Sequence, residues 1–122
     1  MDNEPTLYII MRRDLWDMNP GKGMAQAAHA QTRADDFLVN NSDYMEWKGE
    51  LGFGRTLVLN ATKDEIDTIV QRVAASGFVV DPSYPYRNWY KEIYATSTLT
   101  CAWAFPITDD EFQFLSQFEL HP

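Results

Sequence analysis

The pattern of apolar and polar positions predicts a chain in which strands and helices follow one another. Four short stretches have the apolar or alternating character of strands: residues 7–11, 55–60, 78–81 and 98–105. Three stretches have helical composition or spacing: residues 20–39 and the segments after Thr62 and Thr108. The order β-α-β-α-β-β-α predicts an α/β fold with helices against a sheet and parallel pairing across each crossover. The first stretch is apolar throughout, which favours a central strand.

The first helix has a well-marked predicted start. Asn19 is a suitable N-cap, and Pro20 fits the first helical position because its ring fixes a helical φ angle. The alanine-rich run that follows favours a helix as far as residue 39. We expect residues 42–54, which contain three glycines, to form a loop.

The two later helices each begin with the pattern of a capping box. Glu65 follows Thr62 by three residues, and Glu111 follows Thr108 in the same way. Each pair can satisfy two backbone N–H groups at a helix start. We expect Gly77 to end the middle helix, because glycine readily adopts the conformation found after a helix C-terminus.

The last strand is expected to divide its side chains between two faces. One face would carry Leu99, Cys101, Trp103 and Phe105, and the other Thr98, Thr100, Ala102 and Ala104. In this apolar strand Cys101 is expected to fill the core and not to act as a nucleophile. With one cysteine and two histidines, the chain has no internal disulfide, and we expect no structural metal site.

Composition and charge narrow the class of protein. The 122 residues are 45% hydrophobic and 23% charged, which suits a single folded domain over residues 1–122. The net charge of −8 argues against a protein that coats nucleic acids in general, although a local basic pocket is compatible with it. No apolar run approaches a membrane span, and the acidic N-terminus does not resemble a secretory signal. We therefore expect a cytoplasmic protein that does not bind membranes.

The first helix carries the sharpest candidate for chemistry. Lys22, Gln26 and His29 have the spacing i, i+4 and i+7, which places them on one stripe, and Arg33 continues that stripe. The opposite side is expected to lie close to the sheet through small residues: Ala25, Ala27, Ala28 and Ala34. The free N–H groups of the helix start, together with the Lys22 charge, suit a phosphate, a carboxylate or a developing oxyanion. The alternative is a solvated polar stripe on a surface helix.

The residues around this helix start resemble a known family. The run Gly21-Lys22-Gly23-Met24-Ala25-Gln26-Ala27-Ala28-His29-Ala30 is similar to the G-K-x-x-A-Q-x-x-H-A signature of type 2 peptidyl-tRNA hydrolases. The preceding Arg12-x-Asp14-Leu15 and Met18 resemble that family's R-x-D-L-x-M motif, with one extra residue before Met18. The order of the downstream elements resembles the family's more loosely.

This resemblance implies a fold, a reaction and roles for several residues. It implies a four-stranded mixed sheet with helices on both faces, often in a homodimer. The implied reaction is hydrolysis of the ester between a peptide and the 3′ ribose of tRNA, without a metal or cofactor. Lys22 matches the family's essential lysine, and Gln26 and His29 match the rest of its helical stripe.

The family also uses an acidic residue and a threonine after the third strand, and this chain departs from that pattern. Asp81 stands at about the right place but is followed by Pro82 instead of Ala-Gly, and the threonine would be Thr96 or Thr98. Lys22 would stabilise the oxyanion, while Asp81 would orient water or pair with the lysine. Two alternatives stay open: Asp81 is only a turn residue, or the pocket binds without cutting.

An aromatic segment follows Asp81. Residues 82–94 carry five aromatic rings with Arg87 and Lys91 between them. Such rings can stack on the bases of a single-stranded CCA end, or they can be buried against the domain or a partner subunit. The candidate substrate-binding residues are Gln26, Arg12, Arg13, Arg33 and Arg87. Three functions remain open: an esterase, an inactive module that binds a nucleotide, tRNA end or protein, and a protein inhibitor anchored by this segment.

Overall fold

The computed structural model describes residues 4–15, 18–49, 54–81 and 98–122. Four strands form one sheet: β1 (Thr6–Arg12), β2 (Arg55–Ala61), β3 (Ser76–Asp81) and β4 (Thr98–Ala104). Four helices accompany them: α1 (Pro20–Phe37), α2 (Ser42–Gly49), α3 (Lys63–Arg72) and α4 (Asp109–Leu115). The predicted α/β class is confirmed, with one helix more than the sequence pattern indicated.

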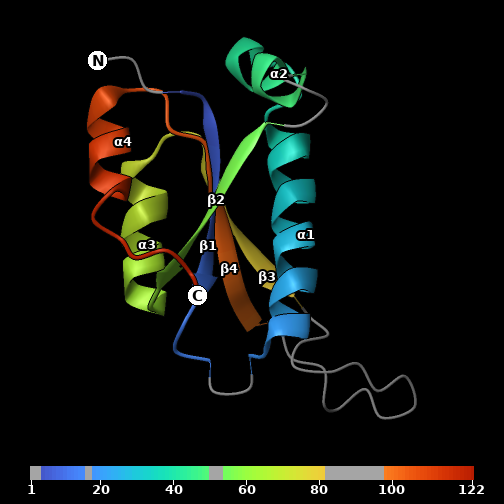
Figure 1. Cartoon of the computed structure of the whole chain (residues 1–122), viewed down its shortest axis with the longest axis vertical. Helices are drawn as coiled ribbons and strands as arrows, with labels where there is room; N and C mark the ends of the chain where they lie inside the picture. The colour runs from blue at the N-terminus through green and yellow to red at the C-terminus, as the bar shows by residue number, and fades with distance from the viewer. Residues whose placement is uncertain (1–3, 16–17, 50–53, 82–97) are drawn as a thin grey trace.

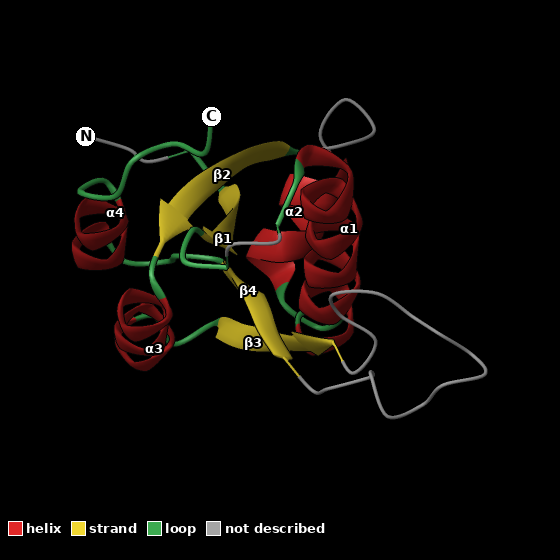
Figure 2. Cartoon of the chain, turned by 90° about the horizontal axis from the view of Figure 1, so that it is seen from below, coloured by secondary structure: helices red, strands yellow, loops and turns green. Residues whose placement is uncertain are grey.

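The sheet is mixed and has the order β2-β1-β4-β3. The apolar β1 lies at its centre as predicted, parallel to β2 and antiparallel to β4. Helices α1 and α2 lie on one side of the sheet, and α3 and α4 on the other (Figure 1). The expectation of parallel pairing is confirmed for β1 and β2 but is wrong for the second crossover. Strands β2 and β3 run in the same direction but do not pair, because β3 lies at the far edge and pairs antiparallel with β4 (Figure 2).

Helix α1 begins where the sequence predicts. The Asn19 side chain accepts a hydrogen bond from the Lys22 N–H at 2.9 Å, and Pro20 occupies the first turn. The helix ends at Phe37, two residues before the predicted end, and the Leu38 N–H still bonds the Ala34 carbonyl at 2.9 Å.

The face that α1 turns to the sheet differs from the predicted one. Its buried residues are Gly23, Gln26, Ala30 and Ala34. The expectation that Ala25 and Ala28 lie against the sheet is wrong, since both are exposed. Gln26 is buried despite its polarity because neighbouring strands supply hydrogen-bond partners for its amide. The face of α1 that packs on the sheet therefore includes part of the predicted polar stripe.

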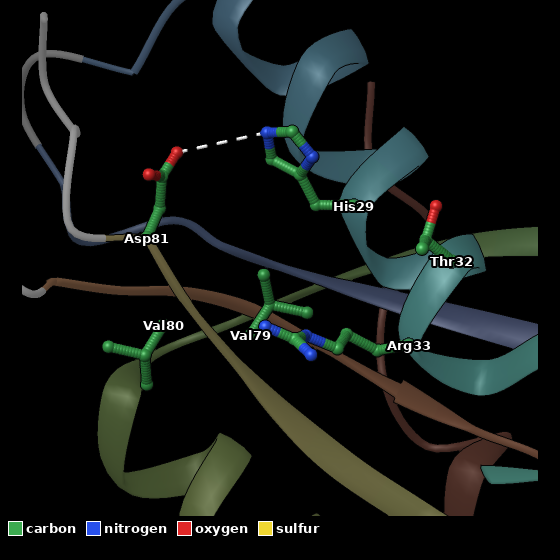
Figure 3. Close-up of a pocket in the computed structure, with 6 residues that line it drawn as sticks. All are labelled: His29, Thr32, Arg33, Val79, Val80 and Asp81. Carbon is green, nitrogen blue, oxygen red and sulfur yellow. Dashed lines mark ion pairs between the residues drawn. The ribbon is translucent and has the colours of Figure 1, made fainter. Parts of the chain in front are cut away.

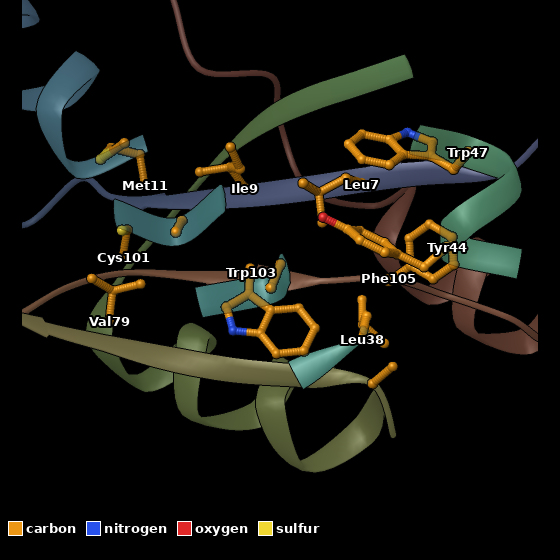
Figure 4. Close-up of a cluster of buried hydrophobic side chains, with 13 residues drawn as sticks. Leu7, Ile9, Met11, Leu38, Tyr44, Trp47, Val79, Cys101, Trp103 and Phe105 are labelled. Atoms are coloured by element: carbon orange, nitrogen blue, oxygen red, sulfur yellow. The ribbon is translucent and has the colours of Figure 1, made fainter. Parts of the chain in front are cut away.

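Residues 42–54 are not all loop, because Ser42–Gly49 form α2. Tyr44 and Trp47 are buried one turn apart, and their rings stack at 5.0 Å between centroids over the edge of Phe105 (Figure 4). The Asn41 side chain accepts from the Tyr44 N–H at 3.0 Å, as an N-cap does. The three glycines of this range led to the wrong prediction of a loop. Gly54, which follows the helix, is required because a Cβ there would collide with Trp47.

Both predicted capping boxes are present. Thr62 and Glu65 cap α3, and Thr108 and Glu111 cap α4. The prediction that Gly77 ends the middle helix is wrong, because α3 ends at Arg72 and Gly77 lies within β3. A Cβ at Gly77 would lie 2.8 Å from the Trp103 indole nitrogen, so glycine makes room for that ring.

A bulge in β4 changes the predicted division of its faces. Val79 pairs with Cys101 and Val80 with Leu99, so Thr100 is an extra residue in the ladder. Leu99 therefore packs in the cluster on the α3 side, whereas Cys101 belongs to the cluster under α1. The expectation that these two side chains share a face is wrong, and the extra residue frees Thr100 to reach α1.

Candidate functional site

One end of the sheet brings several predicted residues together. The C-terminal ends of β1 and β3 and the N-terminal end of β4 meet there, because β1 and β3 run in the same direction. The N-terminal half of α1 crosses this end on one side (Figure 1). The stripe from Lys22 to Arg33 therefore lies beside Asp81, the last residue of β3.

Gln26 connects two strands through its side-chain amide. The Thr100 hydroxyl donates a hydrogen bond to Gln26 Oε1 at 2.6 Å, and Gln26 Nε2 donates to Asp81 Oδ2 at 2.8 Å. Gln26 is 3% exposed and Thr100 is fully buried, so the bond between them is shielded from solvent, while the bond to Asp81 is part-buried. A hydroxyl that donates to the amide oxygen fixes the orientation of the amide, so its NH₂ group faces Asp81.

His29 approaches the same carboxylate from the next turn of α1. Its Nε2 lies 3.8 Å from Asp81 Oδ2, and Figure 3 shows the ring and the carboxylate facing each other. The side chain of His29 is 54% exposed, whereas that of Asp81 is only 13% exposed. A largely buried carboxylate with a solvent-accessible imidazole beside it can hold a water molecule and accept its proton.

A pocket of about 370 Å³ opens next to this pair. It lies between α1 and β3 and is lined by His29, Thr32, Arg33, Val79, Val80 and Asp81. Figure 3 shows Arg33 reaching from α1 toward β3 across this space. The pocket gives a ligand access to Asp81 and places one cation within it.

Lys22 lies in the first turn of α1 and is partly buried. It stands four residues before Gln26, so it lies one helical turn closer to the start of α1 than the residue that bonds Asp81. The positive end of the helix dipole adds to its charge there. A developing oxyanion beside this helix start would meet both.

The other predicted cations have different surroundings. Arg12 donates to the Leu99 carbonyl at 3.0 Å and to Asp14 at 2.7 Å, which ties β1 to the start of β4. Arg13 forms an ion pair with Glu65 at 3.0 Å, at the start of α3 on the opposite face of the sheet. Arg33 lines the pocket, and Arg87 lies outside the described residues, as does the aromatic segment 82–97.

Cys101 lies under the site without belonging to it. It is fully buried, and its thiol contacts the Gln26 carbonyl at 3.5 Å. Burial raises the pKa of the Cys101 thiol to about 12, and the charge of Asp81 contributes in the same direction. The thiol therefore stays protonated at neutral pH, as expected of a core residue and not of a nucleophile.

Thr100 is the site residue that sequence reasoning missed. The sequence pattern placed it on the face away from Cys101 and offered Thr96 or Thr98 as the threonine of the site. Thr98 begins β4, and Thr96 lies outside the described residues. A threonine between apolar residues in a strand gave a weak signal, because only the bulge turns its hydroxyl toward Gln26.

The arrangement suits proton transfer and anion stabilisation. Among the described residues, no three histidine, cysteine or acidic side chains gather as metal ligands. The part of the chain that the structure describes also contains no helix long and apolar enough to cross a membrane.

Comparison with known protein families gives a match over most of the chain. A family model described as "Peptidyl-tRNA hydrolase PTH2" matches residues 6–118, which is nearly the whole chain. A comparison with curated proteins returned no match. The matched range contains all four strands, all four helices and every residue of the site described above.

Proposed function

This chain belongs to the peptidyl-tRNA hydrolase PTH2 family, and on that premise we propose that it hydrolyses the ester between a peptide and the 3′ ribose of tRNA. The observation that carries the proposal is the Asp81 carboxylate, held by the buried Gln26 amide beside His29 and open to a pocket. The resemblance in residues 21–30 adds Lys22, which lies at the start of the same helix.

The site supplies the groups that ester hydrolysis needs. A water held by Asp81 attacks the ester carbonyl carbon and gives up a proton to Asp81 or His29. Lys22 and the start of α1 stabilise the negative oxygen that forms. The bond from the carbonyl carbon to the ribose oxygen then breaks, and that oxygen takes up the proton that Asp81 or His29 had accepted. The products are a free peptide carboxylate and a tRNA with a free 3′-hydroxyl.

Gln26 and Thr100 position Asp81 in this scheme. The Gln26 amide donates a hydrogen bond to Oδ2 of the carboxylate and so holds that oxygen in place. Because Thr100 fixes the amide orientation, the carboxylate has a firm donor on one side and cannot turn freely. Arg33 would add a cation where the substrate enters.

The charge of the whole chain predicts a weak, salt-sensitive complex with tRNA. A net charge of −8 repels the phosphate backbone, so we expect productive contacts to be local and to weaken steeply with added salt. Action in the cytoplasm and assembly as a homodimer are further expectations, of which only the homodimer rests on the resemblance.

The direct test is release of tRNA from an aminoacyl-tRNA whose amino group is acetylated. We expect the wild type to release free tRNA and Lys22→Ala to slow the release on the order of 100-fold, as losing an oxyanion donor does. Lys63→Ala is the matched control, since Lys63 lies on α3 across the sheet and pairs with Asp67 at 3.5 Å.

Two results would contradict this proposal. Absence of release at micromolar enzyme would exclude an esterase. Binding of tRNA without any release would favour the alternative, an inactive module on the same fold.

A further inference from the structure

The two edges of the sheet differ in how they are covered. Beside β2, the C-terminal segment adds a short bridge: the Asn60 N–H bonds the Glu119 carbonyl at 2.9 Å, and the His121 N–H bonds the Val58 carbonyl at 2.7 Å. At the other edge, β3 pairs with β4 on one side, and none of the described elements lies along its other side (Figure 2). An uncovered edge offers unpaired N–H and C=O groups to another extended chain.

The register shows which groups face outward. The Phe105 N–H bonds the Ala75 carbonyl at 2.8 Å, so Ala75 faces β4. In an antiparallel ladder the residues alternate, so Gly77 and Val79 also face β4. The N–H and C=O groups of Ser76, Phe78 and Val80 therefore point to the outer edge.

The surroundings of this edge can hold the side chains of a bound peptide as well as its backbone. On the α1 side lies the pocket that Thr32 and Arg33 line together with Val79 and Val80. On the other side Phe78 and Val80 add apolar surface, since these residues are 43% and 49% exposed. The edge ends at Asp81, where the proposed reaction takes place.

We propose that the peptide part of the substrate binds as an added strand on the outer edge of β3, with its esterified end at Asp81. This inference rests on the proposed function for the identity of the ligand. Main-chain pairing of this kind does not read side chains, so this edge can bind peptides of different sequences.

The direction of the peptide fixes its pairing. Its C-terminal carbonyl forms the ester, so the peptide runs toward Asp81 in the same direction as β3 and pairs parallel to it. The residue at the ester lies opposite Asp81 and donates its N–H to the Val80 carbonyl. The third residue from the ester lies opposite Val79, donates to the Phe78 carbonyl and accepts from the Val80 N–H. The fifth residue forms the same two bonds, donating to the Ser76 carbonyl and accepting from the Phe78 N–H.

The same register separates the peptide's side chains. The third residue shares the face of Val79 and enters the pocket beside Arg33, whereas the second shares the face of Val80. The N–H of the second residue points away from β3, so the binding site does not use it.

The test uses tRNA analogues in which an amide replaces the ester, so that binding is measured without turnover. We expect the Kd of an analogue with five residues to be about tenfold lower than that of one with a single acetylated residue. Methylation of the third residue's nitrogen should raise the Kd about two- to tenfold, the effect of losing a hydrogen bond, and methylation of the second should not. Equal Kd values for all lengths, or equal effects of the two methyl groups, would overturn the inference.

A variant of the protein tests the same bond from the other side. Val80→Pro removes one outward N–H, and proline is tolerated on an edge strand where that N–H makes no ladder bond. We expect Val80→Pro to reduce the ratio of the Kd of the single-residue analogue to that of the five-residue analogue. Val80→Ala keeps the N–H and should leave this ratio unchanged. Circular dichroism checks that both variants fold. Hydrolysis of the acetylated aminoacyl-tRNA is measured separately, so failure of the proposed function is distinguishable from failure of this inference.

Discussion

At the scale of single residues, the burial of Gln26 decides how the site works. The sequence places Gln26 on a polar stripe, where a solvated side chain is the ordinary outcome. In the structure its amide bonds Thr100 and Asp81, which are 74 and 55 positions away in sequence. A buried amide with partners at both ends positions a carboxylate more firmly than a surface residue could.

We predict that Gln26→Leu lowers the free energy of unfolding by about 1–3 kcal/mol, because it leaves the Thr100 hydroxyl and the Asp81 carboxylate without this partner. Urea denaturation at neutral pH measures the change. Gln71→Leu, at an exposed position of α3, is the matched control and should change stability little. A Gln26→Leu protein as stable as the control would mean that the two bonds contribute nothing.

The candidate site was predictable from the sequence only in part. The spacing of Lys22, Gln26 and His29 predicted a shared stripe, and the structure brings Gln26 and His29 to Asp81. Neither the burial of Gln26 nor the role of Thr100 was predictable, because both depend on a one-residue bulge in a distant strand.

At the scale of elements, local signals gave reliable helix starts and unreliable helix ends. Both threonine–glutamate capping boxes and the Asn19 cap formed as predicted, since each depends on residues within one turn. Helix α2 was missed because it is held by the packing of Tyr44 and Trp47 against Phe105, a contact that local sequence does not reveal.

The capping box of α3 makes stability depend on pH. Hydrogen bonds from the Thr62 backbone and hydroxyl, with the nearby Arg13 guanidinium, lower the pKa of Glu65 from its usual 4.5. A carboxyl with a lowered pKa stabilises the fold above its unfolded-state pKa, and this contribution is lost as the pH falls through the folded-state pKa. Glu65→Ala should therefore be less stable than the wild type at pH 7 by about 0.5 kcal/mol, a small value because the carboxylate is partly exposed.

Thermal unfolding measured from pH 7 to pH 3 checks this sign. The gap between wild type and Glu65→Ala should narrow as the pH falls below about 4.5, where the wild type loses the charge of Glu65. Gln71→Ala, which changes no titrating group on the same helix, should show a gap independent of pH. A Glu65→Ala gap that widens toward acid pH would contradict this account.

At the scale of the whole molecule, the strand order β2-β1-β4-β3 explains why the site lies where it does. The order places β3 at an edge and brings its C-terminal end under the start of α1. The sequence predicted the alternation of strands and helices but not this placement of β3, because nothing local in residues 76–81 selects β4 over β2 as its neighbour. The match over residues 6–118 confirms the family resemblance that residues 12–30 had indicated.

The central claim is that Asp81, held by Gln26, acts on an ester bound beside the pocket between α1 and β3. The most direct measurement is kcat/KM for the acetylated aminoacyl-tRNA with wild type and Asp81→Asn, with Asp67→Asn on α3 as the control. We predict that Asp81→Asn lowers kcat/KM by about 100-fold or more, in the range expected for losing a general base, while Asp67→Asn stays near wild type. A folded Asp81→Asn protein that hydrolyses the substrate as fast as the wild type would contradict the account.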